Sequence, residues 1–312
     1  MTLAPSFQTD VPLAGLTTLG VGGPARLYAE VRDVASLKAL LETAKDLPVY
    51  FLGEGSNMLV ADAGFDGLVA RTVAEGRAGL ECLSGIPGLV GAAPMQNIGA
   101  YGQEVAEVLT AVRAVDRQTG EEVRFPKEEC GFAYRTSHFK TDWRDRYVIT
   151  AIELELEKGG APLVKYADLR KRLPQGATPS LQEVRALVLE IRASKSMVYN
   201  PADPNHRSAG SFFLNPIVPK ALADAIQVAD MPVYPAPAGQ VKLSAAWLME
   251  RAGFPKGYVK GRAGLSTNHV LAVINRGGAT AAEILELAAE VRARVHERFG
   301  VELHQEPNLL GF

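Results

Sequence analysis

The sequence has little cysteine, and its two cysteines have no metal-binding spacing. Cys82 and Cys130 lie far apart in a chain of 312 residues, and no CxxC pair is present. Disulfide scaffolds and zinc sites need several cysteines at short, regular spacings. We therefore expect no disulfide framework and no metal site, and we expect a reducing cytoplasm as the compartment.

Long apolar runs and an excess of one charge are also missing. No segment approaches the roughly 18 apolar residues of a membrane-spanning helix. The first residues, MTLAPSFQTD, show no basic start before an apolar core, so we expect no secretory signal. Lys and Arg total 33 and Asp and Glu total 35, giving a net charge of −2, so neither nucleic acid nor a membrane surface is an expected partner. With 47% hydrophobic residues, a chain of this length is expected to fold into two or three lobes.

Apolar periodicity predicts short strands alternating with helices. Asp33 is expected to cap the first helix, Thr178 the second, and Thr280 with Glu283 the last, which Gly300 ends. Residues 196–208 resemble a linker. The expected helices are 33–45, 179–193 and 280–299, and the expected strands are 49–52, 58–60, 111–115, 122–124 and 147–156.

A glycine-rich pentapeptide, Gly53-Glu54-Gly55-Ser56-Asn57, separates the strands 49–52 and 58–60. A Rossmann fingerprint needs a helix after its glycine loop, so that fold is excluded here. Closely spaced glycines let backbone N–H groups converge on a phosphate. A plain tight turn is the alternative interpretation.

Two further segments have an unusual composition. Residues 85–102 are almost all small, which suits a backbone that approaches a flat aromatic ligand; an irregular core loop is the alternative. Ser211 stands between Gly210 and Phe212 without a Gly-x-Ser-x-Gly motif or an adjacent histidine, so a hydrolase site is not supported. Ser211 is a proton donor if a charged group activates it, and otherwise a turn residue.

Taken together, five motifs resemble the UDP-N-acetylenolpyruvoylglucosamine reductase (MurB) family over nearly the whole chain. The resemblance implies an α+β fold with two FAD-binding lobes of the vanillyl-alcohol-oxidase/MurB type and a C-terminal α/β substrate-binding domain. The lobes are expected at 1–70, 71–195 and 196–299, with the tail 300–312 returning to the first lobe or to the active site. The motifs are Leu52–Asn57, Ser84–Gly88, Pro94–Gly102, Phe132–Arg135 and Ala209–Pro216.

The activity implied by this resemblance is that of a flavoprotein oxidoreductase of peptidoglycan and cell-wall precursor synthesis. NADPH reduces bound FAD, and the reduced flavin passes hydride to UDP-N-acetylglucosamine enolpyruvate, giving UDP-N-acetylmuramate. Covalent flavins need a histidine or cysteine beside the ring, and none falls within 85–102, so we expect noncovalent FAD. The enzyme is expected to be a monomer or weak oligomer.

The resemblance also implies residue roles. Ser211 matches the proton donor, Arg135 the cation on the substrate carboxylate, and Glu306 the active-site glutamate. Tyr166, which indicates the subtype called type I, matches a tyrosine that closes over substrate. The other substrate-binding matches are Lys195, Asn215, Tyr234 and Lys242. The matches to FAD-binding positions are Gly53, Glu54, Gly55, Ser56, Asn57, Pro87, Gly88, Gly91, Ala92, Gln96, Asn97, Gly99, Ala100, Tyr101 and Gly102.

The sequence departs from the family at several positions. His304 and Gln305 replace the more usual residues before Glu306, Leu214 replaces a lysine of some members, and Asn308 stands where many have arginine. Two other functions compete: another flavin oxidase of the same superfamily, and a flavin-free UDP-sugar binding protein. The motif Gly210–Pro216 favours the reductase over the oxidase.

An interruption is expected after the strand at 67–69. Family members place several dozen residues between this strand and the helix end that matches 74–76, whereas here Val69 to Ala74 joins the two directly. Either the enzyme lacks part of its second lobe, or the sequence omits residues that the protein contains. We favour omission, because a deletion would expose core beside the cofactor.

Overall fold

The structure is a computed structural model in which residues 6–31, 33–72, 81–88, 90–156, 160–162, 164–174, 176–226, 228 and 230–312 are described. The chain forms two compact units. The first comprises Met1–Thr9, Leu27–Glu54 and Gly67–Ser194, and the second Asp10–Arg26, Gly55–Asp66 and Lys195–Phe312. Both mix helices and strands, which confirms the α+β expectation. The finer division into three lobes stays a prediction.

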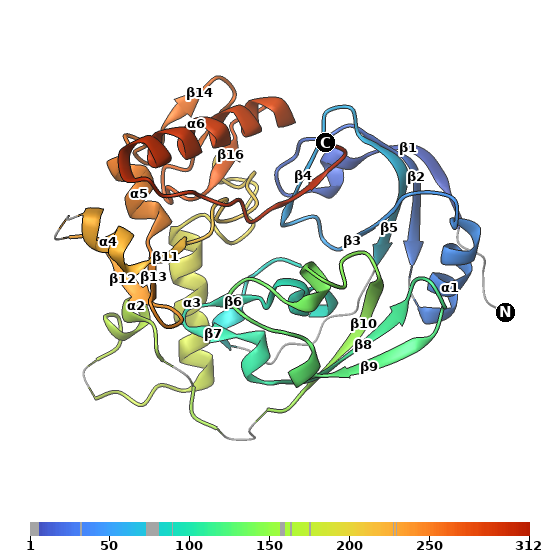
Figure 1. Cartoon of the computed structure of the whole chain (residues 1–312), viewed down its shortest axis with the longest axis horizontal. Helices are drawn as coiled ribbons and strands as arrows, with labels where there is room; N and C mark the ends of the chain where they lie inside the picture. Colours follow the sequence, from blue (N-terminus) through green and yellow to red (C-terminus); the bar gives the residue numbers. More distant parts are fainter. Residues whose placement is uncertain are drawn as a thin grey trace. The chain divides into compact units, whose positions relative to one another are not determined.

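A four-stranded sheet in the order β1-β2-β5-β3 begins the fold (Figure 1). β3 pairs in parallel with β5, Val49 opposite Leu68. The predicted first helix is confirmed as α1, capped by Asp33, whose Oδ1 accepts the backbone N–H of Ser36 at 2.7 Å. Its buried face, Leu37 and Leu40, packs into one apolar cluster with Leu68. The bounds are β1 Gln8–Pro12, β2 Pro24–Val31, α1 Val34–Thr43, β3 Val49–Leu52, β4 Met58–Val60 and β5 Phe65–Thr72.

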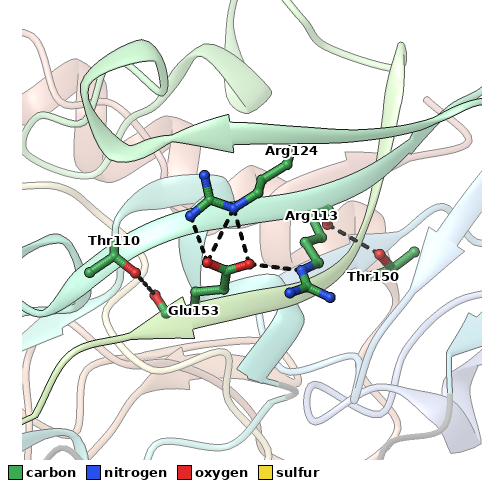
Figure 2. A network of polar contacts seen from close by, with 5 residues as sticks. All are labelled: Thr110, Arg113, Arg124, Thr150 and Glu153. Carbon is green, nitrogen blue, oxygen red and sulfur yellow. Dashed lines mark hydrogen bonds and ion pairs between the residues drawn. The ribbon is translucent and has the colours of Figure 1, made fainter.

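Three antiparallel strands in the order β10-β8-β9 form the second sheet of the first unit. They confirm the predicted strands, and Gly120, at φ +73°, lies in the turn between β8 and β9. One face of this sheet carries Glu153, which accepts hydrogen bonds from Arg124 and Arg113 (Figure 2). These bonds hold the pKa of Glu153 at about 2. The bounds are β8 Leu109–Asp116, β9 Glu122–Pro126 and β10 Tyr147–Leu154.

The helix predicted at 179–193 is present as α3, Leu181–Ser194, but its start was wrong by two residues. Ser180 is the cap: its Oγ accepts the N–H of Glu183, whose carboxylate accepts the N–H of Ser180. Thr178 therefore does not cap the helix. Leu181 is 41% exposed, so the buried stripe begins only at Val184.

Short elements connect the sheets of the first unit. A two-stranded hairpin of β6 and β7 follows the longest 3-10 helix, η3. The bounds are η2 Glu81–Leu83, η3 Val90–Gln96, β6 Gly99–Ala100, β7 Gln103–Glu104, η4 Val105–Glu107, η5 Lys127–Glu129, η6 His138–Lys140 and α2 Ala167–Arg170.

The second unit is built around α6, Ala281–Phe299, as predicted. Thr280 and Glu283 form the capping box, and Gly300 ends the helix at φ +66°. A further carboxylate, Asp62, accepts the N–H groups of Ala281 and Ala282 at 2.7 and 3.1 Å, which suits the positive end of a helix. The whole predicted stripe of α6 is buried in one core: Ile284, Leu287, Ala288, Val291 and Val295.

Three small sheets complete the second unit: β11-β13-β12, β14-β15-β16 and the parallel pair β17-β4. The expected linker at 196–208 was wrong, because Asn205 is buried and bonds to Thr267, which makes the segment part of this unit. The bounds are η1 Leu13–Leu16, β11 Ile217–Pro219, α4 Lys220–Ile226, β12 Val233–Pro235, β13 Gln240–Leu243, α5 Ala245–Arg251, β14 Val259–Lys260, β15 Ala263–Leu265, β16 Val273–Asn275 and β17 Asn308–Leu310.

Within the residues described, no helix is both long enough and apolar enough to cross a membrane. The same part of the chain holds no group of three or more His, Cys, Asp or Glu side chains that could bind a metal ion.

Candidate active site

The small-residue loop of the first unit ends in a tight hairpin. β6 and β7 pair antiparallel, Ala100 opposite Gln103, and leave Tyr101 and Gly102 as the turn. Both turn residues have positive φ, +51° and +81°, the pattern of a type I′ turn. A Cβ on Gly102 would lie 3.1 Å from Cβ of Lys165, so the turn is close-packed as well as left-handed.

Asn97 holds this loop together from inside. It is 1% exposed and has a φ of +46°. Its Nδ2 donates to Glu104 Oε2 at 2.7 Å and to the carbonyl of Ala133 at 3.2 Å, and its Oδ1 accepts the N–H of Ala106 at 3.1 Å. The Asn97 side chain therefore shapes the loop through internal bonds.

Arg135 lies in the same hydrogen-bonded group. Its guanidinium donates to the carbonyl of Gly99 and lies 5.4 Å from the centre of the Tyr134 ring. Lys140 Nζ donates to Gln96 Oε1 and to the carbonyl of Arg135, both at 3.3 Å. Three predicted site residues, Gln96, Gly99 and Arg135, are thus brought together, and Arg135 is also left-handed, at φ +55°.

Arg192 on α3 is a buried cation that the sequence analysis missed. It is 7% exposed, donates to the carbonyl of Gly85 at 3.3 Å, and hydrogen-bonds the side chain of Tyr101. Burial lowers the pKa of Arg192 and raises that of Tyr101. Tyr166, 40% exposed, packs edge-on against Tyr101 with ring centres 5.4 Å apart. Arg192 therefore fixes both ends of the 85–102 loop.

The glycine pentapeptide lies at the boundary between the units along the chain. Gly53 and Glu54 follow β3 in the first unit, and the remaining residues belong to the second. A Cβ on Gly55, whose φ is +63°, would lie 1.9 Å from the carbonyl oxygen of Leu16, so this position admits only glycine. The backbone N–H of Thr18 donates a hydrogen bond to the carbonyl of Gly55, and its hydroxyl donates one to the carbonyl of Ser56.

The C-terminal tail brings Glu306 to the segment of Ser211. The N–H of Glu306 donates to the carbonyl of Phe212 at 2.8 Å, one residue after Ser211. Asn57 Nδ2 donates to the carbonyl of Glu306 at 3.4 Å, and β17 then pairs with β4 (Figure 1). Ser211, Glu306 and Asn57 therefore share one connected part of the second unit.

His269 is the second residue that sequence reasoning missed. Its Nε2 lies 3.3 Å from Ser211 Oγ, although the two residues are 58 positions apart. Burial, with the positive charges of Lys195 and Lys256, lowers the pKa of His269 to about 4. No local sequence signal could have paired His269 with Ser211.

Of the predicted substrate residues of the second unit, Tyr234 and Lys242 lie on a small sheet and Asn215 on the loop before it. Tyr234 in β12 is the register partner of Lys242 in β13. Asn215 Oδ1 accepts the N–H of Ala245 at the start of α5, at 2.9 Å. Lys195 begins the second unit, and its charge acts on His269.

The residues of the 85–102 loop fit a flavin. Gly88 has a φ of +126°, and a Cβ on Gly91 would meet only the carbonyl oxygen of Ile149, at 3.8 Å, so the backbone there is open to close approach. Pro87 and Ala92 add small side chains. Asn97, Tyr101 and Arg135 all have left-handed backbone, and such conformations cluster at ligand sites.

Comparisons with known proteins all point to one family. The family model described as UDP-N-acetylenolpyruvoylglucosamine reductase, C-terminal domain, matches residues 202–310. A UDP-N-acetylenolpyruvoylglucosamine reductase of Thermobifida fusca is 45% identical over 358 residues, covering 98% of each chain. One of Nocardia farcinica is 46% identical and covers 98% of this chain and 90% of the relative. The crystal structure of the Thermus caldophilus enzyme matches with a TM-score of 0.66 at 27% identity, covering 99% of this chain and all of that one.

These similarities define the general class of the chain: it is an α+β protein with the C-terminal domain of a reductase. It belongs to the UDP-N-acetylenolpyruvoylglucosamine reductase family. The aligned region of the Thermobifida relative, 358 residues, is 46 longer than this whole chain, so the alignment contains internal positions that have no residue here. The interruption is expected between Val69 and Ala74; within this interval Val69 to Thr72 form the end of β5, and Val73 and Ala74 lie outside the described residues, so the interruption stays a prediction.

Proposed function

We propose that this chain reduces UDP-N-acetylglucosamine enolpyruvate to UDP-N-acetylmuramate, using FAD and NADPH, in peptidoglycan precursor synthesis. The observation that carries the proposal is the pairing of the Glu306 and Ser211 segments inside a chain whose relatives of 41–46% identity carry the reductase name. The buried thiols Cys82 and Cys130 fit a reducing compartment, and we place the enzyme in the cytoplasm.

The 85–102 loop and the pentapeptide Gly53–Asn57 would hold FAD, and the bound cofactor would supply hydride, taken from NADPH, for the vinyl carbon of the substrate. Negative charge then builds on the substrate carboxylate, and the adjacent carbon needs a proton. We assign the stabilising cation to Arg135 and the proton to the hydroxyl of Ser211. We also assign Glu306 to the reacting enolpyruvyl group of the substrate, because the paired tail fixes its position.

Binding roles follow from the local geometry. Lys242 and its cross-strand partner Tyr234 present a cation and a phenol together, which suits a diphosphate. Asn215 uses its carbonyl oxygen for α5, so its amide nitrogen is assigned to the substrate. Lys195 is assigned to the substrate carboxylate, and Tyr166 to closure over the bound sugar. The 85–102 loop and the pentapeptide are assigned to FAD.

A stopped-flow experiment tests the proposal. The holoenzyme is reduced with NADPH under anaerobic conditions and mixed with the authentic enolpyruvyl substrate, with UDP-N-acetylglucosamine as the matched ligand that has no double bond. We expect fast flavin reoxidation by the first and none by the second. Reoxidation by oxygen alone would instead support a flavin oxidase, and a colourless protein that cannot be reconstituted would support a binding protein.

A further inference from the structure

The hydroxyl of Ser211 has a specific side-chain neighbour. His269 Nε2 lies 3.3 Å from Ser211 Oγ, within hydrogen-bonding distance. Both residues belong to the second unit, so the contact depends on the fold of that unit alone. A titratable side chain therefore lies beside the proposed proton donor.

The loop that carries His269 is fixed by its own hydrogen bonds. Ser266 is fully buried, and its Oγ accepts the N–H groups of Asn268 and His269 at 3.1 and 3.3 Å. The carbonyl of His269 accepts the N–H of Ala272 at 3.0 Å. Next to them, Asn205 Oδ1 accepts the N–H of Thr267 at 3.0 Å. The backbone of His269 is thereby held on both sides.

The segment of Ser211 is bonded to the same loop. The N–H of Phe212 donates to the carbonyl of Leu271 at 2.8 Å, and the carbonyl of Phe212 accepts the N–H of Glu306. Ser211 thus lies one residue from a bond to the His269 loop and one residue from a bond to the tail. This double attachment fixes the distance between imidazole and hydroxyl, as a catalytic hydrogen bond requires.

The protonation state of His269 decides what it does to the hydroxyl. Burial and the facing cations Lys195 and Lys256 keep the imidazole neutral at neutral pH. A neutral imidazole carries one N–H. When that proton is on Nε2, it is donated to Ser211 Oγ, and the hydroxyl proton is left to point away from His269. The opposite tautomer would draw the hydroxyl proton toward the ring and away from a substrate.

We propose that His269 is a positioning residue for Ser211: its neutral imidazole donates Nε2–H to Oγ, aims the hydroxyl proton at the substrate carbon, and stabilises Oγ as that proton leaves. In the step, the O–H bond of Ser211 breaks and the electron pair of the substrate enolate forms the new C–H bond. The Oγ anion, held by Nε2–H, then regains a proton from water. The inference rests on the proposed function of this site.

Half-reaction kinetics of the holoenzyme test it. We expect His269→Leu, which keeps the bulk and removes the donor, to slow reoxidation by the enolpyruvyl substrate about 10- to 100-fold, the range for a hydrogen bond to a group that becomes charged. Reduction by NADPH should change less than about twofold. His269→Gln, which places an N–H close to the Nε2 position, should recover most of the rate. His206→Gln, in the same unit but bonded to the backbone of Asp203, is the matched control and should match wild type.

A double-mutant cycle separates orientation from structure. If His269 acts through Ser211, His269→Leu should have almost no further effect on reoxidation in a Ser211→Ala background. Equal slowing in both backgrounds, or equal slowing of both half-reactions, would overturn the proposal. A wild-type holoenzyme that the enolpyruvyl substrate does not reoxidise would instead refute the proposed function. If His269→Leu does not fold, His269→Ala takes its place in the same cycle, and additive effects of His269→Ala and Ser211→Ala on reoxidation overturn the proposal.

Discussion

Asn97 offers a sharp test of how the 85–102 loop is built. Replacing it with alanine removes three hydrogen bonds, to Glu104, Ala133 and Ala106. At about 0.5–1.5 kcal/mol for each bond, the loss is roughly 2–4 kcal/mol. Alanine must also adopt the left-handed backbone at φ +46°, which costs about 1–2 kcal/mol more. We expect Asn97→Ala to lower the free energy of unfolding by about 3–6 kcal/mol.

A glycine at the same position separates the two causes. Asn97→Gly loses the same three bonds but adopts positive φ freely, so it should be about 1 kcal/mol more stable than Asn97→Ala. Asp145→Ala is the matched control, because Asp145 is left-handed at φ +62° on the surface of the same unit. Its ion pair with Arg144 is exposed and contributes little, so this variant should lose mainly the backbone contribution, about 1–2 kcal/mol.

Urea unfolding measures these differences, and flavin fluorescence on dilution measures FAD release. If the loop holds FAD, the dissociation constant of Asn97→Ala should rise about tenfold or more, since tenfold corresponds to about 1.4 kcal/mol. If Asn97→Ala is as stable in urea as the wild type, the hydrogen-bond reasoning is wrong. If the alanine and glycine variants are equally stable, the backbone reasoning is wrong. Wild-type FAD affinity in a destabilised Asn97→Ala would place the cofactor elsewhere.

Three other outcomes are expected. Ser211→Ala should leave flavin reduction by NADPH intact and slow reoxidation by about 10²–10⁴-fold in stopped flow, whereas equal slowing of both would make Ser211 structural. Trichloroacetic acid should release all yellow colour to the supernatant, since we expect noncovalent FAD; colour in the pellet would contradict this. The pKa of Glu153 is lowered from 4.5 to about 2 by Arg124 and Arg113, so the bonds between its carboxylate and these two arginines stabilise the fold above about pH 4.5. This stabilisation is lost as the pH falls through about 2. The Tm difference between wild type and Glu153→Gln should therefore vanish across that window and shrink in high salt, and a difference that persists at pH 2 would show that charge is not its cause (Figure 2).

Local signals in the sequence predicted the regular elements well. The capping box of α6 and Gly300 fix its two ends through contacts within a few residues of the chain, so the sequence pattern contains them. The start of α3 was misplaced because Thr178 and Ser180 are both good caps, and the choice depends on Glu183, three residues after Ser180. Residues 196–208 looked like a linker because their turn composition does not reveal that Asn205 bonds Thr267.

The parts of the site that sequence could not predict depend on long-range contacts. His269 meets Ser211 across 58 positions, and Arg192 meets Gly85 across 107. Neither pair has a periodic or spacing signal, because the fold alone brings the partners together. For Asn97 the motif identified the residue, but its internal bonds explain the residue type differently: the amide is needed to hold the loop.

The C-terminal tail shows how a residue that looks like a surface charge is held beside the Ser211 segment. Every second residue of the tail makes a backbone hydrogen bond. The carbonyl of His304 accepts the N–H of Leu214, and the N–H groups of Glu306 and Asn308 donate to the carbonyls of Phe212 and Asn57. Such alternation is the pattern of an extended strand, so the backbone, not the side chains, sets where Glu306 lies. His304 is tolerable for the same reason, because it contributes a main-chain carbonyl that any residue would supply. Asn308 contributes its backbone N–H, which any residue except proline would supply, and its side-chain Nδ2 adds a bond at 3.4 Å to the same carbonyl of Asn57. The position of Glu306 therefore depends on the tail's pairing with the Ser211 segment and with β4, and a proline at 306 or 308 would disturb it more than a change of side chain at 304.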